Sequence, residues 1–168
     1  MPAALKAFLK ESQPGSVLIP GCGAAYEVRA FHEAGWTVTA IDFSPVAVKN
    51  ARARLGALAR SVVEGDFFSH DFAGRRFDVI YERTFLCALP PGVWPAYVNR
   101  MTQLLCSNGK LVGIFLYSEE NDPPPYPLNA DKTRELFEGS FSLTKTLPIS
   151  DSLPLFVGKE LWQEWVLI

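Results

Sequence analysis

The amino-acid sequence predicts an α/β fold with a doubly wound, mostly parallel sheet of seven strands, helices on both faces and an antiparallel hairpin at the C-terminal edge. Through the first two-thirds of the chain, short apolar runs alternate with segments of helical periodicity, which favours a parallel sheet between helices. The last third holds two strand-like segments with no full helix between them. The chain has 168 residues, 48% of them hydrophobic, which is enough for one core. We therefore expect a single domain over residues 1–168.

Seven segments have the short apolar or alternating pattern that is typical of β-strands. In chain order they are Ser16–Pro20, Trp36–Ile41, Ser61–Glu64, Phe77–Tyr81, Leu111–Tyr117, Phe141–Leu147 and Leu161–Ile168. The first is a β-branched run that ends at Pro20 and Gly21. Because no full helix separates the last two segments, we expect them to pair as the antiparallel hairpin.

Four segments have the features of helices. They are Ala24–Ala34, Pro45–Leu55, Pro90–Leu105 and Asn129–Phe137. Ser44 places a capping hydroxyl directly before the proline at the start of the second helix. Pro95 fits the third helix only within its first turn. We expect a turn at Ser107–Gly109 and a proline-dense loop over Ser118–Pro127.

Composition and charge exclude several classes of protein. The chain has 16 Lys and Arg against 18 Asp and Glu, a net charge of −2, so no basic surface for nucleic acid is expected. No apolar run approaches the ~20 residues of a membrane span, and the first ten residues lack the pattern of an export signal. Three cysteines without a CxxC pair and two isolated histidines argue against a metal site. We expect a soluble, cytoplasmic monomer without metal.

The first two strands are followed by residues suited to a nucleotide-like ligand. In an open parallel sheet, ligands bind beyond the carboxyl ends of the strands. Gly21, Cys22 and Gly23 follow the first strand, and two glycines here allow a tight turn and close approach of backbone N–H groups to a ligand. Asp42 lies nineteen residues beyond Gly23, at the spacing of a carboxylate that binds ribose hydroxyls. The alternative is that Asp42 only caps the helix that starts after Ser44.

The third position of the glycine turn helps to choose between adenosine-containing ligands. A dinucleotide site needs a further glycine where this chain has Tyr26, whereas S-adenosylmethionine has no pyrophosphate and makes fewer demands on this turn. After the third strand, Asp66 can accept a hydrogen bond from an adenine amino group and Phe67 can cover the ring. The alternative is that Asp66 begins a loop and Phe67 fills the core. The pattern favours a methyl donor over NAD, and an NAD-dependent oxidoreductase remains the lesser alternative.

Five stretches of the sequence resemble the class I S-adenosylmethionine-dependent methyltransferases, and among them the thiopurine S-methyltransferase superfamily with its thiol and halide methyltransferases. They are VLIPGCG (Val17–Gly23), VTAIDFSPVAV (Val38–Val48), GDFF (Gly65–Phe68), FDVIYERTFLCALPP (Phe77–Pro91) and PPPYPL (Pro123–Leu128). The first two are general to class I, and the last two point to the superfamily. The resemblance implies a Rossmann-like fold and S-adenosylmethionine as the methyl donor.

The resemblance also implies roles for residues in the first half of the site. Gly21 and Gly23 would line the methionine end of the donor, and Asp42 would bind its ribose. Cys22 and Phe43 are expected to contact the donor beside them. No base partner for Cys22 is evident in the sequence, so we expect a small residue that fits the turn rather than a nucleophile.

In the second half, the resemblance places Asp66 and Phe67 at the adenine. Arg83 matches a position that faces both donor and acceptor, and it is the expected catalytic residue. A guanidinium there can pair with a carboxylate or with an anionic acceptor. Glu82 is a further expected donor-binding residue. The alternative for Arg83 is a surface arginine near Glu82.

Members of this family carry a tryptophan-rich segment before the first strand that folds over donor and acceptor. Sixteen residues precede Val17 here, and none is tryptophan. Three explanations are open: this covering segment is missing, another segment replaces it, or the chain is part of a longer protein. How the acceptor is enclosed depends on which of the three is correct.

We therefore expect a methyltransferase that acts on a small-molecule acceptor, foremost a thiol, a thiopurine or another soft nucleophile. A thiol ionises in part near neutral pH, so a dedicated general base is optional. One alternative is a small-molecule O- or N-methyltransferase, for which Glu82 and Tyr81 would be the candidate acid or base. The other is a domain that binds S-adenosylmethionine without catalysis.

Overall fold

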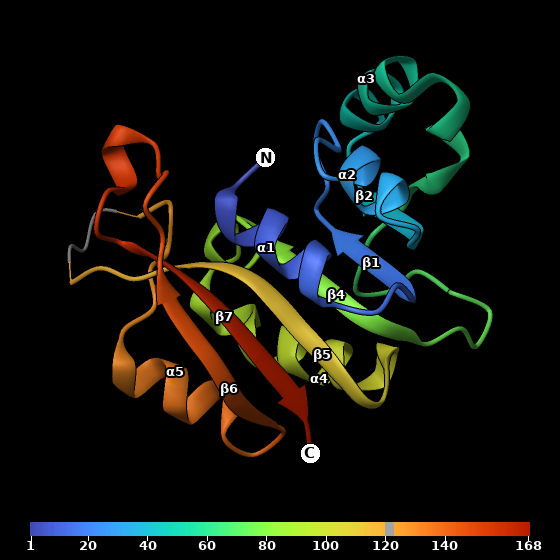
Figure 1. The fold of residues 1–168 in the computed structure, drawn as a ribbon. Coiled ribbons are helices and arrows are strands. Elements are labelled where there is room, and N and C mark those ends of the chain that lie inside the picture. The colour runs from blue at the N-terminus through green and yellow to red at the C-terminus, as the bar shows by residue number, and fades with distance from the viewer. Residues whose placement is uncertain (120–122) are drawn as a thin grey trace.

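The computed structural model describes residues 1–119 and 123–168, and its centre is a seven-stranded sheet in the order β3-β2-β1-β4-β5-β7-β6 (Figure 1). The strands are β1 (Ser16–Pro20), β2 (Thr37–Asp42), β3 (Val62–Glu64), β4 (Phe77–Arg83), β5 (Leu105–Leu116), β6 (Phe141–Pro148) and β7 (Glu160–Leu167). Strands β1 to β5 are parallel, and β7 is antiparallel to both β5 and β6. This confirms the predicted doubly wound sheet with an antiparallel hairpin at its C-terminal edge.

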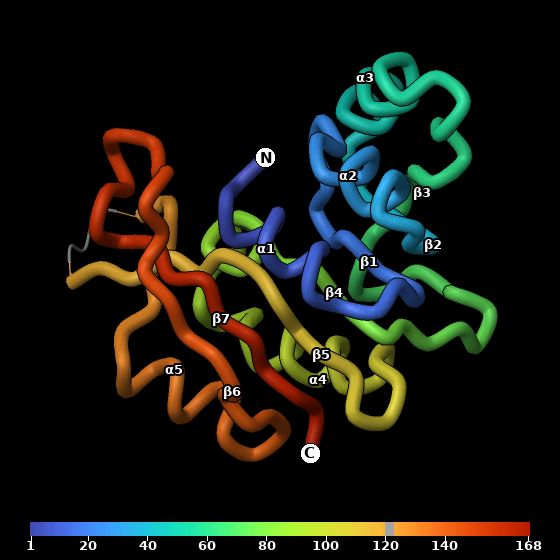
Figure 2. Tube along the Cα trace, in the orientation of Figure 1, coloured from blue at the N-terminus to red at the C-terminus, as the bar shows by residue number. Residues whose placement is uncertain are grey.

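Helices cover both faces of the sheet, as predicted. They are α1 (Ala3–Glu11), α2 (Val28–Glu33), α3 (Pro45–Leu55), α4 (Trp94–Leu104) and α5 (Ala130–Phe137). Buried side chains of α1, α2 and α3 belong to one core, and those of α4 and α5 belong to the core on the opposite face. Figure 2 shows α1 in front of the sheet and α4 behind it. None of the helices in the described part of the chain has the length and apolarity needed to cross a bilayer.

Strand β4 lies between the two cores, and its side chains point alternately into one and the other. Val79 and Tyr81 lie in the core shared with α2, where the rings of Tyr81 and Phe31 are 5.4 Å apart. Ile80 lies in the opposite core, shared with α4. Because side chains alternate along a strand, consecutive residues at the carboxyl end of β4 also face opposite ways. This alternation decides which of them can reach a ligand.

The helix predicted over Ala24–Ala34 begins only at Val28. Gly21, Gly23 and Ala25 have positive φ values of 56°, 49° and 53°, so the chain makes a left-handed turn where a helix was expected. The loop after β1 is therefore longer than the sequence indicated. Helix α3, in contrast, has its predicted bounds, and the Ser44 side chain accepts the backbone N–H of Ala47 at its start.

Three other segments differ from their predictions. Strand β4 continues two residues beyond Tyr81. The turn expected at Ser107–Gly109 lies inside β5, where the pairing with β4 shifts register and Asn108 has a φ of 60°. Helix α1 had no counterpart in the sequence prediction. Residues 120–122 of the predicted proline-dense loop lie outside the described residues.

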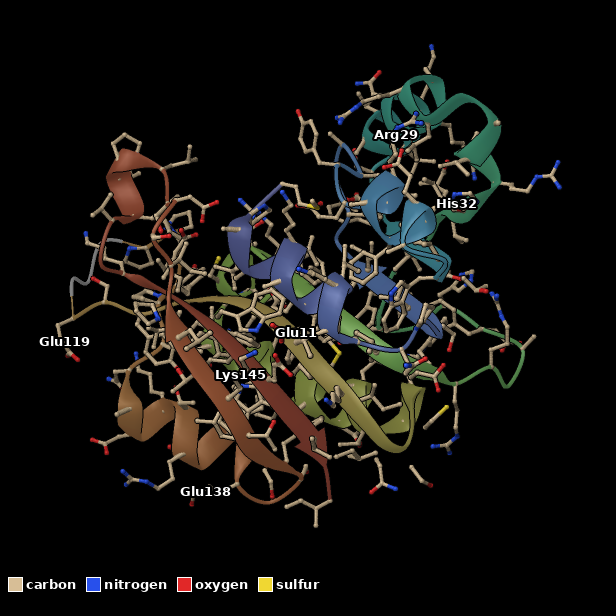
Figure 3. All side chains as sticks on the ribbon, viewed as in Figure 1. Glu11, Arg29, His32, Glu119, Glu138 and Lys145 are labelled. Atoms are coloured by element: carbon tan, nitrogen blue, oxygen red, sulfur yellow. The ribbon has the colours of Figure 1, made fainter. Side chains whose placement is uncertain are left out.

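Helix α1 joins the N-terminal segment to the C-terminal hairpin. Its Phe8 ring lies 6.0 Å from the ring of Trp36 and 5.7 Å from that of Trp162. Figure 3 shows Glu11 and Lys145 pointing toward one another, and their Oε2 and Nζ atoms are 3.5 Å apart. The two ends of the described chain therefore pack on the same face of the sheet.

Candidate active site

The glycine turn lies at the carboxyl end of β1, between the sheet and the following helix. A Cβ added to Gly21 would meet Cδ2 of Phe85 at 2.3 Å, so the absence of a side chain lets this ring pack against the turn. A Cβ on Gly23 would have no neighbour within 4 Å, so this glycine borders open space. The turn therefore has one packed side and one side that a ligand can approach.

Asp42 ties three strand ends together. Its Oδ2 accepts the backbone N–H of Gly23 at 2.8 Å, and its Oδ1 accepts that of Ser44 at 2.9 Å. Its backbone oxygen accepts the N–H of Gly65, which follows β3, at 3.0 Å. The side chain of the next residue, Phe43, is 78% exposed. The Asp42 carboxylate therefore lies against the glycine turn and also holds Ser44, which caps the start of α3.

Asp66 and Phe67 form the loop after β3. Asp66 Oδ1 accepts the backbone N–H of Phe68 at 3.0 Å, and Oδ2 accepts the hydroxyl of Ser69 at 2.9 Å. Phe67 is buried, with its ring 5.3 Å from that of Phe85. Phe68 is half-buried beside both rings. The aromatic group therefore links the loop after β3 to the residue that packs on the glycine turn.

Glu82, at the end of β4, faces the α4 side of the sheet. Its Oε1 accepts the backbone N–H groups of Phe85 and Leu86 at 2.8 and 3.0 Å, and its Oε2 accepts the Tyr97 hydroxyl at 2.8 Å. Burial raises the pKa of this carboxyl above its ordinary value, while the three hydrogen bonds oppose that shift. All three of these hydrogen bonds come from the protein itself, which is typical of a carboxylate with a structural role.

Tyr81 and Arg83 face the opposite way, toward α2. Arg83 Nε lies 3.7 Å from Oε1 of Glu27, the residue that directly precedes that helix. Neither the buried Nη1 of Arg83 nor the buried hydroxyl of Tyr81 has a hydrogen-bond partner among the described residues. Burial raises the pKa of Tyr81, and the nearby Glu27 raises it further, while Arg83 opposes the shift. On this face, the Tyr81 hydroxyl and the Arg83 guanidinium from the end of β4 lie beside the Glu27 carboxylate from the start of α2.

Cys22 has none of the features of a nucleophile. Burial, with a smaller effect of the Asp42 charge, raises the pKa of its thiol to about 12, so the thiol stays protonated near neutral pH. Within residues 1–119 and 123–168, no three His, Cys, Asp or Glu side chains are grouped as a metal ion would require. Tyr26, at the position where a dinucleotide site needs glycine, points outward at 68% exposure, and the guanidinium of Arg54 lies over its ring.

Several cavities lie near or beyond this edge of the sheet, among them one of about 590 Å³ between α5 and the C-terminal hairpin. Another, of about 260 Å³, borders the end of β5 and is lined on its apolar side by Leu116, Pro124, Pro125, Leu155 and Phe156. A groove of about 520 Å³ runs between α4 and α5, on the helices rather than at the strand ends. None of these three cavities is lined by Asp42, Asp66 or Arg83, so the candidate site is defined by the polar groups at the carboxyl ends of β1 to β4 and not by cavity size.

A sequence model described as Thiopurine S-methyltransferase matches residues 1–161 of the chain. The chain belongs to the thiopurine S-methyltransferase family. This confirms the resemblance seen in the sequence. Relatives of the chain include "Probable thiol methyltransferase 2" of Arabidopsis thaliana, 34% identical over 123 residues, which are 70% of this chain and 54% of that protein.

Two further relatives differ from the first in identity or in coverage. "Thiocyanate methyltransferase 1" of Arabidopsis thaliana is 27% identical over 90% of this chain and 69% of its own length. "Thiopurine S-methyltransferase" of Vibrio campbellii is 35% identical over 47% of this chain and 37% of its own length. The chain spans about half the length of "Probable thiol methyltransferase 2".

Solved structures share the fold of this family member. The glycopeptide N-methyltransferase MtfA, complexed with S-adenosylmethionine, has a TM-score of 0.78 at 18% identity, covering 99% of this chain and 93% of MtfA. The magnesium protoporphyrin IX methyltransferase ChlM of Synechocystis, with bound S-adenosylhomocysteine, has a TM-score of 0.79 at 16% identity, covering 98% and 80%. These matches confirm the predicted Rossmann-like sheet.

Sequence reasoning missed two residues of this edge, Glu27 and Phe85. Glu27 looked like a solvated residue off the apolar face of a helix, yet it pairs with Arg83. Phe85 packs where a side chain on Gly21 would otherwise be. Gly21 was the only sequence signal of a close contact at this bend, and nothing in the sequence indicated that Phe85 makes it.

Proposed function

We propose that this chain binds S-adenosylmethionine at the carboxyl ends of β1 to β4 and transfers its methyl group to a small-molecule thiol. The observation that carries this proposal is the family match over residues 1–161, together with the Asp42 carboxylate held at the glycine turn. The names of the relatives, a thiol, a thiocyanate and a thiopurine S-methyltransferase, support a soft acceptor. Fold neighbours complexed with the donor or its demethylated product support the ligand.

The first half of the site suits the ribose and the methionine end of the donor. Gly21, Cys22 and Gly23 give a turn that is open on one side, which lets backbone approach the methionine end. Asp42 accepts one backbone N–H at each carboxylate oxygen and retains a further lone pair on each for ribose hydroxyls. Exposed Phe43 lies next to it.

The second half suits adenine and the reacting end. Asp66 is exposed and can accept from the adenine amino group in addition to its two internal hydrogen bonds. Buried Phe67 supports the aromatic wall whose half-buried member is Phe68. Arg83 supplies positive charge beside the expected acceptor. The residues present therefore fit the donor.

We do not place Glu82 at the donor, because its carboxylate faces α4, is buried, and accepts three hydrogen bonds from the protein. We assign it the role of holding the turn at Phe85, whose ring packs on Gly21. For the same reason Glu82 is not available as a general base for an oxygen or nitrogen acceptor. A thiol acceptor fits this site better, since it needs no such base.

When bound, S-adenosylmethionine supplies a methyl group on a positively charged sulfur, which a thiolate can accept. The protein's own contribution is to hold the two reactants in alignment. In favourable cases such alignment lowers the activation barrier by about 7–11 kcal/mol. The rings of Phe67, Phe68 and Phe85 make an apolar wall that keeps water from this edge. Gly21 is part of this arrangement because its missing side chain leaves room for Phe85.

Several sequence predictions belong to the same proposal. Residues 1–168 would form a single methyltransferase domain, supported by the one seven-stranded sheet that both cores share. The net charge of −2 supports a small-molecule partner rather than nucleic acid. A monomeric state and a cytoplasmic location stay predictions from the sequence.

Titration calorimetry with S-adenosylmethionine, S-adenosylhomocysteine and NAD tests the donor assignment. We expect both adenosyl compounds to bind and NAD not to bind. Transfer of a labelled methyl group to an aryl thiol, thiocyanate, iodide, a phenol and an amine then tests the acceptor class. Turnover confined to the phenol or the amine would contradict the thiol assignment, and donor binding without any turnover would indicate a domain without catalysis.

A further inference from the structure

The connection from β3 to β4 carries the residues expected at adenine, yet it contains no helix. It comprises residues 65–76, all of which the structure describes, and Asp66 and Phe67 lie near its beginning. A connection between parallel strands usually contains a helix, whose backbone hydrogen bonds give the segment a fixed shape. Because this connection has no helix, its shape depends on support from another element.

Residues 66–70 form a single turn that begins at Asp66. The Asp66 carbonyl oxygen accepts the backbone N–H groups of Ser69 and His70 at 3.2 and 2.8 Å. The Asp66 carboxylate accepts the backbone N–H of Phe68 and the hydroxyl of Ser69. Since no helical turn follows, the later carbonyl groups of this turn do not receive the N–H groups that a longer helix would supply.

Arg100, on helix α4, donates to these carbonyl groups instead. Its Nε donates to the carbonyl oxygen of Phe67 at 3.0 Å, and its Nη2 donates to the carbonyl oxygen of His70. The guanidinium carbon also lies 5.6 Å from the ring centre of buried Phe72, further along the connection. The planar guanidinium donates in fixed directions, so these two hydrogen bonds fix the position of the turn relative to α4.

The two sides of the turn have different surroundings. Phe67 is buried in the core that α4 shares, whereas the Asp66 side chain is exposed. Arg100 donates to backbone carbonyl groups and not to the Asp66 carboxylate. The carboxylate therefore keeps lone pairs for a ligand while the backbone that carries it is held from the opposite side.

We propose that Arg100 is a positioning residue for recognition of adenine. By holding the carbonyl groups of Phe67 and His70, it sets the point at which Asp66 accepts a hydrogen bond from the adenine amino group. This inference rests on the proposed function, and it adds to the donor site a residue that acts through the loop after β3.

Two variants of Arg100 test this role by their effect on discrimination between two ligands. The ligands are S-adenosylhomocysteine and S-inosylhomocysteine, in which an oxygen replaces the adenine amino group. Calorimetry is expected to show that the wild type prefers the adenosyl compound about tenfold, the scale of one hydrogen bond to a charged group. We expect this preference to be lost in Arg100→Gln and to be intermediate in Arg100→Lys, because lysine keeps the charge but not the two fixed donor directions.

The matched control is Arg52→Lys, on helix α3. Arg52 Nε and Nη2 both donate to the carbonyl oxygen of Val62, at 3.1 and 2.9 Å, so this arginine holds the beginning of β3 rather than the loop after it. Thermal melting reports the loss of stability in each variant. We expect Arg52→Lys to keep the preference of the wild type. An equal fall of the preference in Arg52→Lys and Arg100→Lys would indicate general loosening of β3 and overturn the inference.

A double variant tests whether Arg100 acts through Asp66. Asp66→Ala removes the proposed acceptor of the adenine amino group, so we expect it to abolish the preference by itself. Adding Arg100→Lys is then expected to lower the preference no further, because coupled residues are not additive. A further fall of the preference in the double variant would overturn the proposed route through Asp66.

The proposed function fails separately from this inference. If the wild-type protein binds neither S-adenosylmethionine nor S-adenosylhomocysteine, the donor assignment itself is wrong. If the wild type prefers the adenosyl compound and both Arg100 variants keep the same preference, only the role of Arg100 is wrong. A wild type that binds both homocysteine compounds equally well would contradict the role of Asp66 and overturn this inference with it.

Discussion

The two faces of the sheet at the carboxyl end of β4 treat their polar groups in opposite ways. Toward α4, the Glu82 carboxylate accepts three hydrogen bonds from the protein. Toward α2, the Tyr81 hydroxyl and Arg83 Nη1 are buried atoms without a hydrogen-bond partner in the described residues, although the Arg83 side chain as a whole is 33% exposed. Tyr81, Glu82 and Arg83 are consecutive in sequence, so their positions along the chain do not explain the difference. The difference lies in which of these polar groups the described residues supply with hydrogen bonds.

The comparison suggests how to separate structural from functional polar residues in this fold. A buried group whose hydrogen bonds are complete stabilises the chain, and its loss is expected to appear in the free energy of unfolding. A buried group with unused donors is expected to appear in ligand affinity instead. The following variants test this separation, beginning with the largest expected effect.

Glu82→Ala is expected to lower the free energy of unfolding by about 3 kcal/mol or more, because three donors lose their common acceptor in a buried site. Urea denaturation measures this change. Glu82→Gln retains the shape and one acceptor oxygen, so we expect it to cost less. A Glu82→Ala protein of unchanged stability with weakened donor binding would remove the contrast between the two faces.

Asp42→Ala is expected to weaken S-adenosylmethionine binding by roughly 1.5–3 kcal/mol, the range for hydrogen bonds to charged groups. Calorimetry well below the melting temperature of the variant measures the dissociation constant. Asp42→Asn keeps the shape but removes the charge, and we expect an intermediate loss. A dissociation constant that does not change would count against ribose binding by Asp42 and leave only its role at the start of α3.

Asp78, at the amino end of β4, is expected to contribute to stability at neutral pH and to lose that contribution at low pH. Hydrogen bonds from the Ser16 backbone N–H and then from its hydroxyl lower the Asp78 pKa below its ordinary 3.8. This contribution is therefore present above that ordinary value and is lost as the pH falls through the lowered one. The stability difference between the wild type and Asp78→Asn, followed by denaturation from pH 7 down to about pH 2, should shrink toward the acid end. A difference that grows toward low pH would contradict the assignment.

Much of the fold was predictable because its local signals agree with its tertiary structure. Strand β1 and helix α3 have their predicted bounds, the latter because Ser44 and Pro45 mark its start chemically. Helix α2 was predicted too long because the left-handed residues include Ala25, which has no sequence signature for positive φ. Helix α1 was missed because its stability comes from packing, with Phe8 between two tryptophans.

The candidate site was predictable only where the signal is local. The glycine turn and Asp42 could be found from spacing, and the structure brings them within hydrogen-bond distance. The proposed structural role of Glu82 depends on which face of β4 each side chain takes, and a one-residue change of register reverses that assignment. The pairing of Glu27 with Arg83 could not be predicted, because it depends on where α2 begins.

The order of strands at the hairpin edge has a consequence for biosynthesis. Strand β7 is the last strand in the sequence, yet it lies between β5 and the outermost strand β6 (Figure 1). During translation, β6 therefore has no hydrogen-bonded neighbour until residues 160–167 have emerged from the ribosome. A nascent chain paused before that point exposes both β5 and β6 as unpaired edges, which are the surfaces that chaperones and aggregating chains engage.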